Sequence, residues 1–255
     1  MIRNALIVLS FIFSIIISTV LYATRDSLVS EHIRDNLDIT TITVNNAKIY
    51  LVERNGKTIM IDSGNPGDEE KIEAYMAEAG LEPSAIDYLI ITHGHLDHIG
   101  TAAYFQSRYD IKVIGGQGDA LMFSEGIQQP LCATSLMASA IDMSLQGKTY
   151  PLLKADILVE GPYDLGQLGI KGKITPMPGH TLGTLLVSFD DIIFVGDLIR
   201  GELVRQSTPN RHFFMCDLAD NDRDIATVLG MTQFTRWYPG HFGSLLAKDV
   251  ARYWP

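Results

Sequence analysis

The order of apolar and polar positions predicts strands and helices that alternate along the chain. Residues 39–52 are rich in β-branched side chains and are divided by the polar pair Asn45-Asn46, which is typical of a β-hairpin. Residues 68–80 open with acidic residues and close on glycine, as a helix does. Further strands are expected at 58–61, 86–91, 111–114, 157–159, 170–174, 185–189, 192–195 and 236–238, and further helices at 97–108 and 219–230.

Residues 117–150 have little alternation and place methionine and leucine among small residues, which predicts short helices laid over another element. The chain has no internal repeat and no low-complexity linker. A β-rich half, crossover helices and a second β-rich half therefore predict an α/β protein with two layers of sheet rather than a helical bundle.

The N-terminal segment is uncharged from residue 4 to residue 24, follows Arg3, and includes Leu21-Tyr22-Ala23, a plausible cleavage end. It is also long enough to span a bilayer. Two interpretations stay open, a signal peptide at 1–23 that is removed or a retained N-terminal membrane anchor. Both predict that residues 24–255 form a single domain that is exported to a periplasmic or extracellular location, with membrane contact only through the uncleaved segment.

Composition limits the remaining possibilities. Of 255 residues, 20 are Lys or Arg and 30 are Asp or Glu, so the formal charge is −10 and a nucleic-acid partner is not expected. Two cysteines are too few for a disulfide scaffold or a cysteine-built zinc site. In an oxidising compartment Cys132 and Cys216 can pair, and the alternative is two small buried thiols.

The densest candidate chemistry follows the apolar run at 86–91, where residues 92–98 read Thr-His-Gly-His-Leu-Asp-His. In an extended backbone His93 and His95 point the same way, whereas Asp97 and His98 lie at the turn into the next helix and aim at an adjacent point. Imidazole nitrogens and a carboxylate without thiolates suit zinc and tolerate iron or manganese.

Three later positions complete this candidate metal set. His180 lies in a Gly/Pro loop, Asp197 ends an apolar strand, and His241 follows Tyr238-Pro239-Gly240. Each alone is more often a capping or hydrogen-bonding group, but their joint occurrence in this order indicates a metal site.

The combined motifs His-x-His-x-Asp-His, Gly-His-Thr-x-Gly, Gly-Asp and Pro-Gly-His resemble the metallo-β-lactamase fold superfamily, in its glyoxalase-II-like and lactonase-like branch, over about residues 39–243. The resemblance implies a four-layer αββα sandwich of two mixed sheets flanked by helices. It implies that Asp62-Ser63-Gly64 supports the metal loop without ligating. It also implies two zinc ions, the first bound by His93, His95 and His180, the second by Asp97, His98 and His241, with Asp197 bridging the two.

Two such cations can share one water and lower its pKa to roughly 7, so that hydroxide attacks an acyl carbon. The expected activity is hydrolysis of a small lactone, ester, thioester or amide, with Asp97 as the catalytic residue that orients the hydroxide and moves a proton to the leaving group. The resemblance also implies that a bridging Asp197 argues against true β-lactamase activity. With 12 residues after Gly243, no tail domain of the kind found in glyoxalase II itself is expected.

Three other functions that use the same metal-binding residues stay open as alternatives. A small-phosphodiester hydrolase uses the same two-metal chemistry, a sulfur dioxygenase of the same fold binds one iron, and a binding module would hold purely structural metals. Arg200, Arg205 and Arg211 either hold a substrate carboxylate or phosphate or form a solvated basic loop. His32 and His212 have no predicted role, and the sequence indicates no oligomeric state.

Overall fold

The computed structural model describes residues 24–254, and within them two sheets face each other. The larger sheet has seven strands in the order β1-β2-β3-β4-β5-β6-β7. Its neighbours are antiparallel from β1 to β4 and parallel from β4 to β7, so the sheet is mixed. The strands are β1 (Ser27–Arg34), β2 (Leu37–Val44), β3 (Ala47–Arg54), β4 (Lys57–Ile61), β5 (Ile86–Ile90), β6 (Lys112–Gly116) and β7 (Ile157–Val159).

The second sheet has six strands in the order β15-β14-β11-β10-β9-β8 and is also mixed, because only β11 and β14 are parallel. A two-stranded ribbon of β12 (Arg200–Gly201) and β13 (Pro209–Asn210) lies apart from both sheets. The six strands are β8 (Tyr163–Asp164), β9 (Lys173–Pro176), β10 (Leu185–Phe189), β11 (Ile192–Gly196), β14 (Arg236–Pro239) and β15 (Leu245–Leu246).

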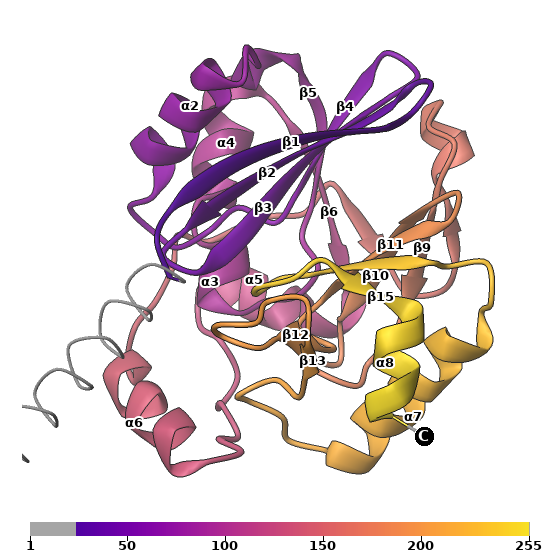
Figure 1. Ribbon diagram of the computed structural model, residues 1–255. Coiled ribbons are helices and arrows are strands. Elements are labelled where there is room, and N and C mark those ends of the chain that lie inside the picture. The colour runs from indigo at the N-terminus through magenta and orange to yellow at the C-terminus, as the bar shows by residue number, and fades with distance from the viewer. Residues whose placement is uncertain (1–23, 255) are drawn as a thin grey trace, which may run out of the picture.

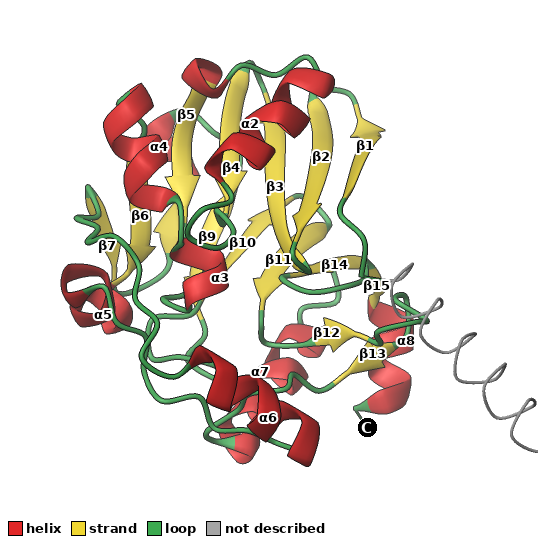
Figure 2. Ribbon diagram, turned by 90° about the vertical axis from the view of Figure 1, so that its left-hand side faces the viewer, coloured by secondary structure: helices red, strands yellow, loops and turns green. Residues whose placement is uncertain are grey.

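Helices cover the outer faces of both sheets. In Figure 2 α2 (Glu69–Glu78) and α4 (Ala102–Tyr109) lie on one face of the larger sheet. In Figure 1 α7 (Leu218–Gly230) and α8 (Ala247–Tyr253) lie beside the second sheet. The remaining α-helices of residues 24–254 are α3 (Leu96–Ile99), α5 (Ala120–Glu125) and α6 (Leu136–Leu145), and three short 3-10 helices lie at Pro83–Ala85, Gln117–Asp119 and Leu165–Leu168.

Three buried apolar clusters correspond to the three contacts between layers. One joins the larger sheet to α2 and α4 through residues such as Ile72 and Phe105. The central one packs the sheets together around Tyr50 and Phe194, whose rings meet edge to face with centroids 4.9 Å apart. The third packs α7 on the second sheet around Trp237. The predicted αββα sandwich is therefore confirmed.

Several boundaries differ from those predicted. The helix expected at 97–108 is two helices, because the Gly100 amide donates to the Gly64 carbonyl at 2.9 Å rather than to a carbonyl of its own helix. The next residue, Thr101, donates a hydrogen bond from Oγ1 to the Ser63 carbonyl at 2.5 Å. The strand expected at 170–174 begins only at Lys173, because the Ile170 amide donates back to the Leu165 carbonyl. Strand β1 was not predicted, and as an edge strand it buries none of its residues fully.

Cys132 and Cys216 form a disulfide, which resolves the alternative left by the sequence and is compatible with an oxidising compartment. The proposed signal peptide or anchor at 1–23 lies outside the described residues. Within residues 24–254 no helix is both long and apolar enough to cross a membrane.

Candidate metal centre

The seven predicted metal-binding side chains meet at one end of the sandwich, although they come from both sheets. His93 and His95 follow β5, and Asp97 and His98 lie on the short helix α3. From the second sheet, His180 lies in the loop between β9 and β10, Asp197 follows β11 directly, and His241 follows β14. The ends of strands that are far apart in sequence thus deliver the side chains to one place.

One group consists of His93, His95, His180 and Asp197, whose candidate ligand atoms all lie within 4.8 Å of one another. Nε2 of His180 faces Nδ1 of His95 at 3.0 Å. Oδ2 of Asp197 lies 3.7 Å from Nε2 of His93 and 3.8 Å from Nε2 of His180. All four side chains are buried, so water does not solvate these atoms.

A second group, Asp97, His98 and His241, is equally compact. Nε2 of His241 lies 3.2 Å from Oδ2 of Asp97, and Nε2 of His98 lies 3.8 Å from Oδ1 of Asp97. Asp197 reaches this group too, with Oδ2 at 3.3 Å from His98 and 3.4 Å from His241. The carboxylate of Asp197 therefore lies between the two groups.

The atoms that converge here fit a metal ion better than they fit one another. Among the described residues, Nε2 of His93, Nε2 of His98 and Oδ1 of Asp197 are buried without a hydrogen-bond partner. Such atoms cost free energy unless something satisfies them. Nitrogen and oxygen donors are the ligands of zinc, iron and manganese sites, and the two cysteines are consumed by their disulfide. The residues present thus fit a cation at each group.

The other ring nitrogen of each of three histidines is held by the protein. Nδ1 of His93 lies 3.0 Å from Oγ1 of Thr92, Nδ1 of His98 lies 2.8 Å from Oδ2 of Asp62, and Nδ1 of His241 lies 2.8 Å from the Asn46 carbonyl. Contacts of this kind fix the tautomer and the ring orientation of a ligand histidine. In each case Nε2 is left to face the cluster.

Burial and charge act differently on the two groups. Burial is the main cause that lowers the pKa of His93 and His180 well below the usual range and that of His95 to about 4. These rings are therefore neutral, with a lone pair available for a cation. Burial opposes protonation of His98 and His241 as well, but the nearby carboxylates outweigh it. They raise the pKa of His98 well above its ordinary value and that of His241 to about 10.

Burial alone would raise the pKa of both carboxyl groups, but neighbouring histidines lower it instead. His98 and His241 lower the pKa of Asp97, and His212, His241 and His98 lower that of Asp197 well below the ordinary value. Asp97 and Asp197 are therefore both ionised at neutral pH. The second group therefore has a strong local preference for positive charge, as a divalent cation would supply.

The structure adds a residue that the sequence did not indicate, His212. Its Nε2 lies 3.0 Å from Oδ2 of Asp197, and its ring stacks on that of His241 with centroids 5.4 Å apart. Nδ1 lies 3.2 Å from both the amide and the carbonyl of Phe214, and because an ionised carboxylate can only accept, Nε2 is the atom that donates to Asp197. His212 lies in an irregular loop after β13, where no spacing pattern marks it.

A buried carboxylate, Asp119, joins the two metal-facing loops and was also not predicted. It accepts hydrogen bonds from the Gly94 amide and the Gly183 amide at 2.8 Å each, and from Oγ1 of Thr181 at 2.7 Å. Burial raises its pKa. Asp119 thereby fixes the loop of His93 and His95 against the loop of His180.

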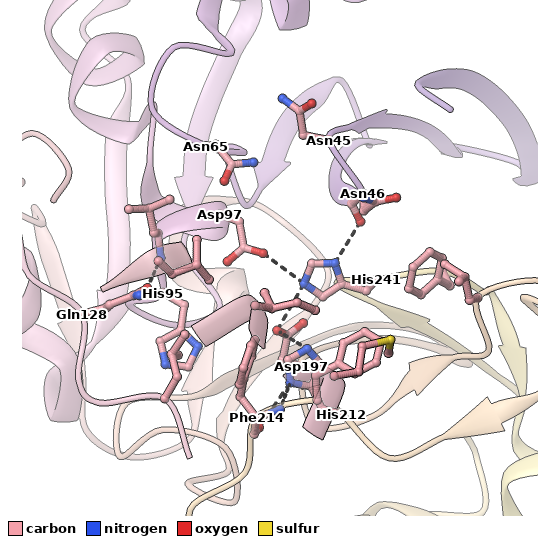
Figure 3. Close-up of a pocket in the computed structure, with 18 residues that line it drawn as sticks. Asn45, Asn46, Asn65, His95, Asp97, Gln128, Asp197, His212, Phe214 and His241 are labelled. Atoms are coloured by element: carbon pink, nitrogen blue, oxygen red, sulfur yellow. Dashed lines mark hydrogen bonds and ion pairs between the residues drawn. The ribbon is translucent and has the colours of Figure 1, made fainter. Parts of the chain in front are cut away.

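A cavity of about 310 Å³ opens onto the cluster (Figure 3). Its floor is formed by His95, Asp97, Asp197, His212 and His241, and apolar residues of the 131–145 segment form one wall. This volume is at the lower end of the roughly 300–1,000 Å³ that is usual for small-molecule sites.

Comparison with known proteins identifies related sequences. The family model described as the metallo-beta-lactamase superfamily matches residues 42–212. The probable metallo-hydrolase YqgX of Bacillus subtilis (strain 168) is 30% identical over 168 residues, which cover 62% of this chain and 71% of that protein. A hydroxyacylglutathione hydrolase of Anaeromyxobacter dehalogenans (strain 2CP-C) is 27% identical over 150 residues, which cover 59% of this chain. The match spans 45% of that relative's length.

Solved structures show the same fold at low sequence identity. BJP-1, a subclass B3 metallo-beta-lactamase of Bradyrhizobium japonicum, superimposes with a TM-score of 0.59 at 17% identity, covering 83% of this chain and 77% of that one. Rm3 metallo-beta-lactamase gives a TM-score of 0.62 at 18% identity, covering 87% and 81%. At these identities the likeness concerns the fold alone.

Proposed function

This chain belongs to the metallo-beta-lactamase superfamily and is a hydrolase of that superfamily, and from this premise we propose that it is an exported enzyme that uses two zinc ions to cleave an acyl bond in a small molecule. The bond is that of a lactone, ester, thioester or amide. The name of the relatives that act on hydroxyacylglutathione, a thioester, supports acyl transfer to water.

The observation that carries the proposal is the convergence of unpartnered histidine nitrogens on both sides of the Asp197 carboxylate. In this proposal His93, His95 and His180 hold one cation, Asp97, His98 and His241 hold the other, and Asp197 contacts both. When bound, two such cations supply a water of lowered pKa and a Lewis acid for the carbonyl oxygen.

The chain's own groups then position the substrate and move protons. Asp97 differs from Asp197 in its exposure, with a side chain 33% accessible against 2%, so it faces the cavity from which substrate approaches. Its lowered pKa keeps it ionised at neutral pH, so that it can accept a hydrogen bond from the attacking water and orient it. Asp97 is therefore the proposed catalytic residue.

Export is proposed on two grounds. The disulfide between Cys132 and Cys216 is of a kind that persists in oxidising compartments, and the apolar segment at residues 4–24 has the pattern of a signal peptide or anchor. Fractionation of cells that express the full chain tests this proposal. The protein is expected outside the cytoplasm.

The test is elemental analysis of the purified full chain together with a hydrolysis screen over lactones, esters, thioesters, β-lactams and phosphodiesters. Two zinc ions per chain and turnover of an acyl substrate support the proposal. One iron per chain with oxygen consumption on a sulfur substrate overturns it in favour of a dioxygenase. Turnover confined to phosphodiesters overturns the acyl assignment.

A further inference from the structure

The cavity above the metal-facing residues is lined mainly by apolar side chains, and this lining bears on which substrates can bind. We propose that it selects an uncharged acyl substrate with an apolar group, and that it excludes substrates with a second, anionic group. This inference rests on the proposed function for the bond that is cleaved, but the cavity's selectivity can be tested without turnover.

Helix α6 supplies one apolar wall. Met137, Ile141 and Leu145 line the cavity and are spaced four residues apart, so they form one stripe of the helix. Met143 lies off this stripe and is 74% exposed. Leu131, just before the helix, extends the same wall.

A second wall of the cavity is apolar as well. Leu203, Phe213, Phe214 and Phe242 line it, from segments of the second half of the chain. The two walls are joined by the disulfide between Cys132 and Cys216 and by a hydrogen bond from the Thr134 amide to the Phe213 carbonyl at 2.9 Å. The apolar slot between them is thus a built feature of the structure.

No lysine or arginine is among the described residues that line the cavity. The arginines that the sequence offered for a substrate anion are used elsewhere. Arg205 pairs with Glu202 at 3.1 Å and Arg211 pairs with Asp222 at 2.7 Å. The Arg200 guanidinium stacks on the Phe213 ring, 3.8 Å from its centroid, and donates to the Gly201 carbonyl.

A remote carboxylate or phosphate on a substrate would therefore lose its water without gaining a cationic partner, which is unfavourable. The polar groups that remain on the walls are neutral carboxamides. Asn46 lines the cavity, and its buried Oδ1 has no hydrogen-bond partner among the described residues. A carboxamide both donates and accepts, so it matches an uncharged amide or carbonyl of a substrate.

The binding test uses two fluorescent probes with the same aromatic body, neutral phenylnaphthylamine and anionic anilinonaphthalene sulfonate. The purified full chain is titrated with each. We expect the neutral probe to bind at least about tenfold more tightly, because the apolar walls away from the metal-facing floor offer the sulfonate no cationic partner. Equal affinity for both probes overturns the proposal.

Substitutions on α6 test whether the difference in affinity between the two probes arises in this cavity. Ile141→Lys places an ammonium on the lining stripe and is expected to strengthen binding of the sulfonate and weaken that of the neutral probe. Met143→Lys, on the same helix but off the stripe, is the matched control and should change neither. A similar effect of both variants overturns the proposal, and thermal unfolding checks that both remain folded.

The kinetic test compares neutral butanoyl, hexanoyl, octanoyl and decanoyl esters with esters of the same length that end in a carboxylate. For the neutral series kcat/KM should rise by up to about tenfold for each added pair of methylenes until the cavity is filled. The carboxylate series should not rise, and equal slopes overturn the proposal. If no acyl compound is hydrolysed while the probes still discriminate, the proposed reaction fails and the cavity assignment stands.

Discussion

Asp62 and His98 form a buried contact in which Oδ2 of the carboxylate lies 2.8 Å from Nδ1 of the ring. Asp62 is one of the few non-glycine residues with positive φ, 60°, a conformation that costs free energy. Its carboxylate also accepts from the amide and hydroxyl of Thr92, at the start of the metal loop. Asp62 therefore orients His98 and fixes the loop without belonging to either metal-facing group.

Asp62→Ala removes this support and is expected to weaken zinc binding by about 10–100-fold, the usual effect of losing the partner of a ligand histidine. Chelator competition measures it. Asp87→Ala is the control, because Asp87 also accepts from a backbone amide, that of Thr58, at a position away from the cluster. Unchanged zinc affinity in Asp62→Ala would contradict the orienting role.

Asp97→Ala is expected to lower turnover by at least about hundredfold while the chain stays folded, because the three apolar clusters do not include Asp97. Activity on the best acyl substrate and thermal unfolding are measured together. An inactive but unfolded variant, or an unaffected rate, counts against the assignment.

Asp197→Ala should reduce the zinc content from two ions per chain toward one, because its Oδ2 lies between both groups. Elemental analysis after dialysis gives the stoichiometry. Retention of two tightly held ions would show that this carboxylate is not shared.

His212→Ala is expected to weaken zinc binding by about 10–100-fold by freeing the Asp197 carboxylate, and His212→Gln should restore part of the loss because an amide can still donate. His32→Ala is the matched control, since His32 lies on the edge strand β1 and pairs with Asp38 in a solvent-exposed contact. If the Gln and Ala variants are equally impaired, donation to Asp197 is not the reason.

Lys48 provides a prediction about stability and pH. Its ammonium is buried, and burial, partly opposed by Glu31, lowers its pKa from 10.5 to about 8. Between these values the unfolded chain binds more protons than the native one, so this residue's contribution to stability rises with pH across that window. Below about pH 8 the contribution is a constant penalty.

Lys48→Met should therefore raise the free energy of unfolding at neutral pH by about 1–3 kcal/mol and flatten its rise with pH. Urea unfolding at several pH values measures both. Lys57→Met, at a more exposed lysine of the neighbouring strand, is the comparison. Destabilisation by Lys48→Met would mean that the hydrogen bond from Nζ to the Gly243 carbonyl outweighs the cost of burial.

The sequence predicted most of the fold because its strands are short apolar runs bounded by turn residues, and it located the site because four metal-type side chains fall within residues 92–98. Asp119 and His212 were not predictable in this way. Asp119 contacts Thr181, which lies 62 positions later in the chain, and His212 contacts Asp197, which lies 15 positions earlier. Only the packing of the two sheets creates these contacts. The break at Gly100 likewise results from a hydrogen bond of its amide to the distant Gly64 carbonyl, which helix propensity does not report.

The two halves of the sandwich each supply only part of the ligand set, since residues 93–98 follow the larger sheet and His180, Asp197 and His241 follow the second. An unfolded chain therefore contains no assembled site, and because each group takes residues from both halves, a cation at either group would hold the two halves together. If the chain binds a cation as it folds, the ions present in the compartment where it folds would influence which metal occupies the site.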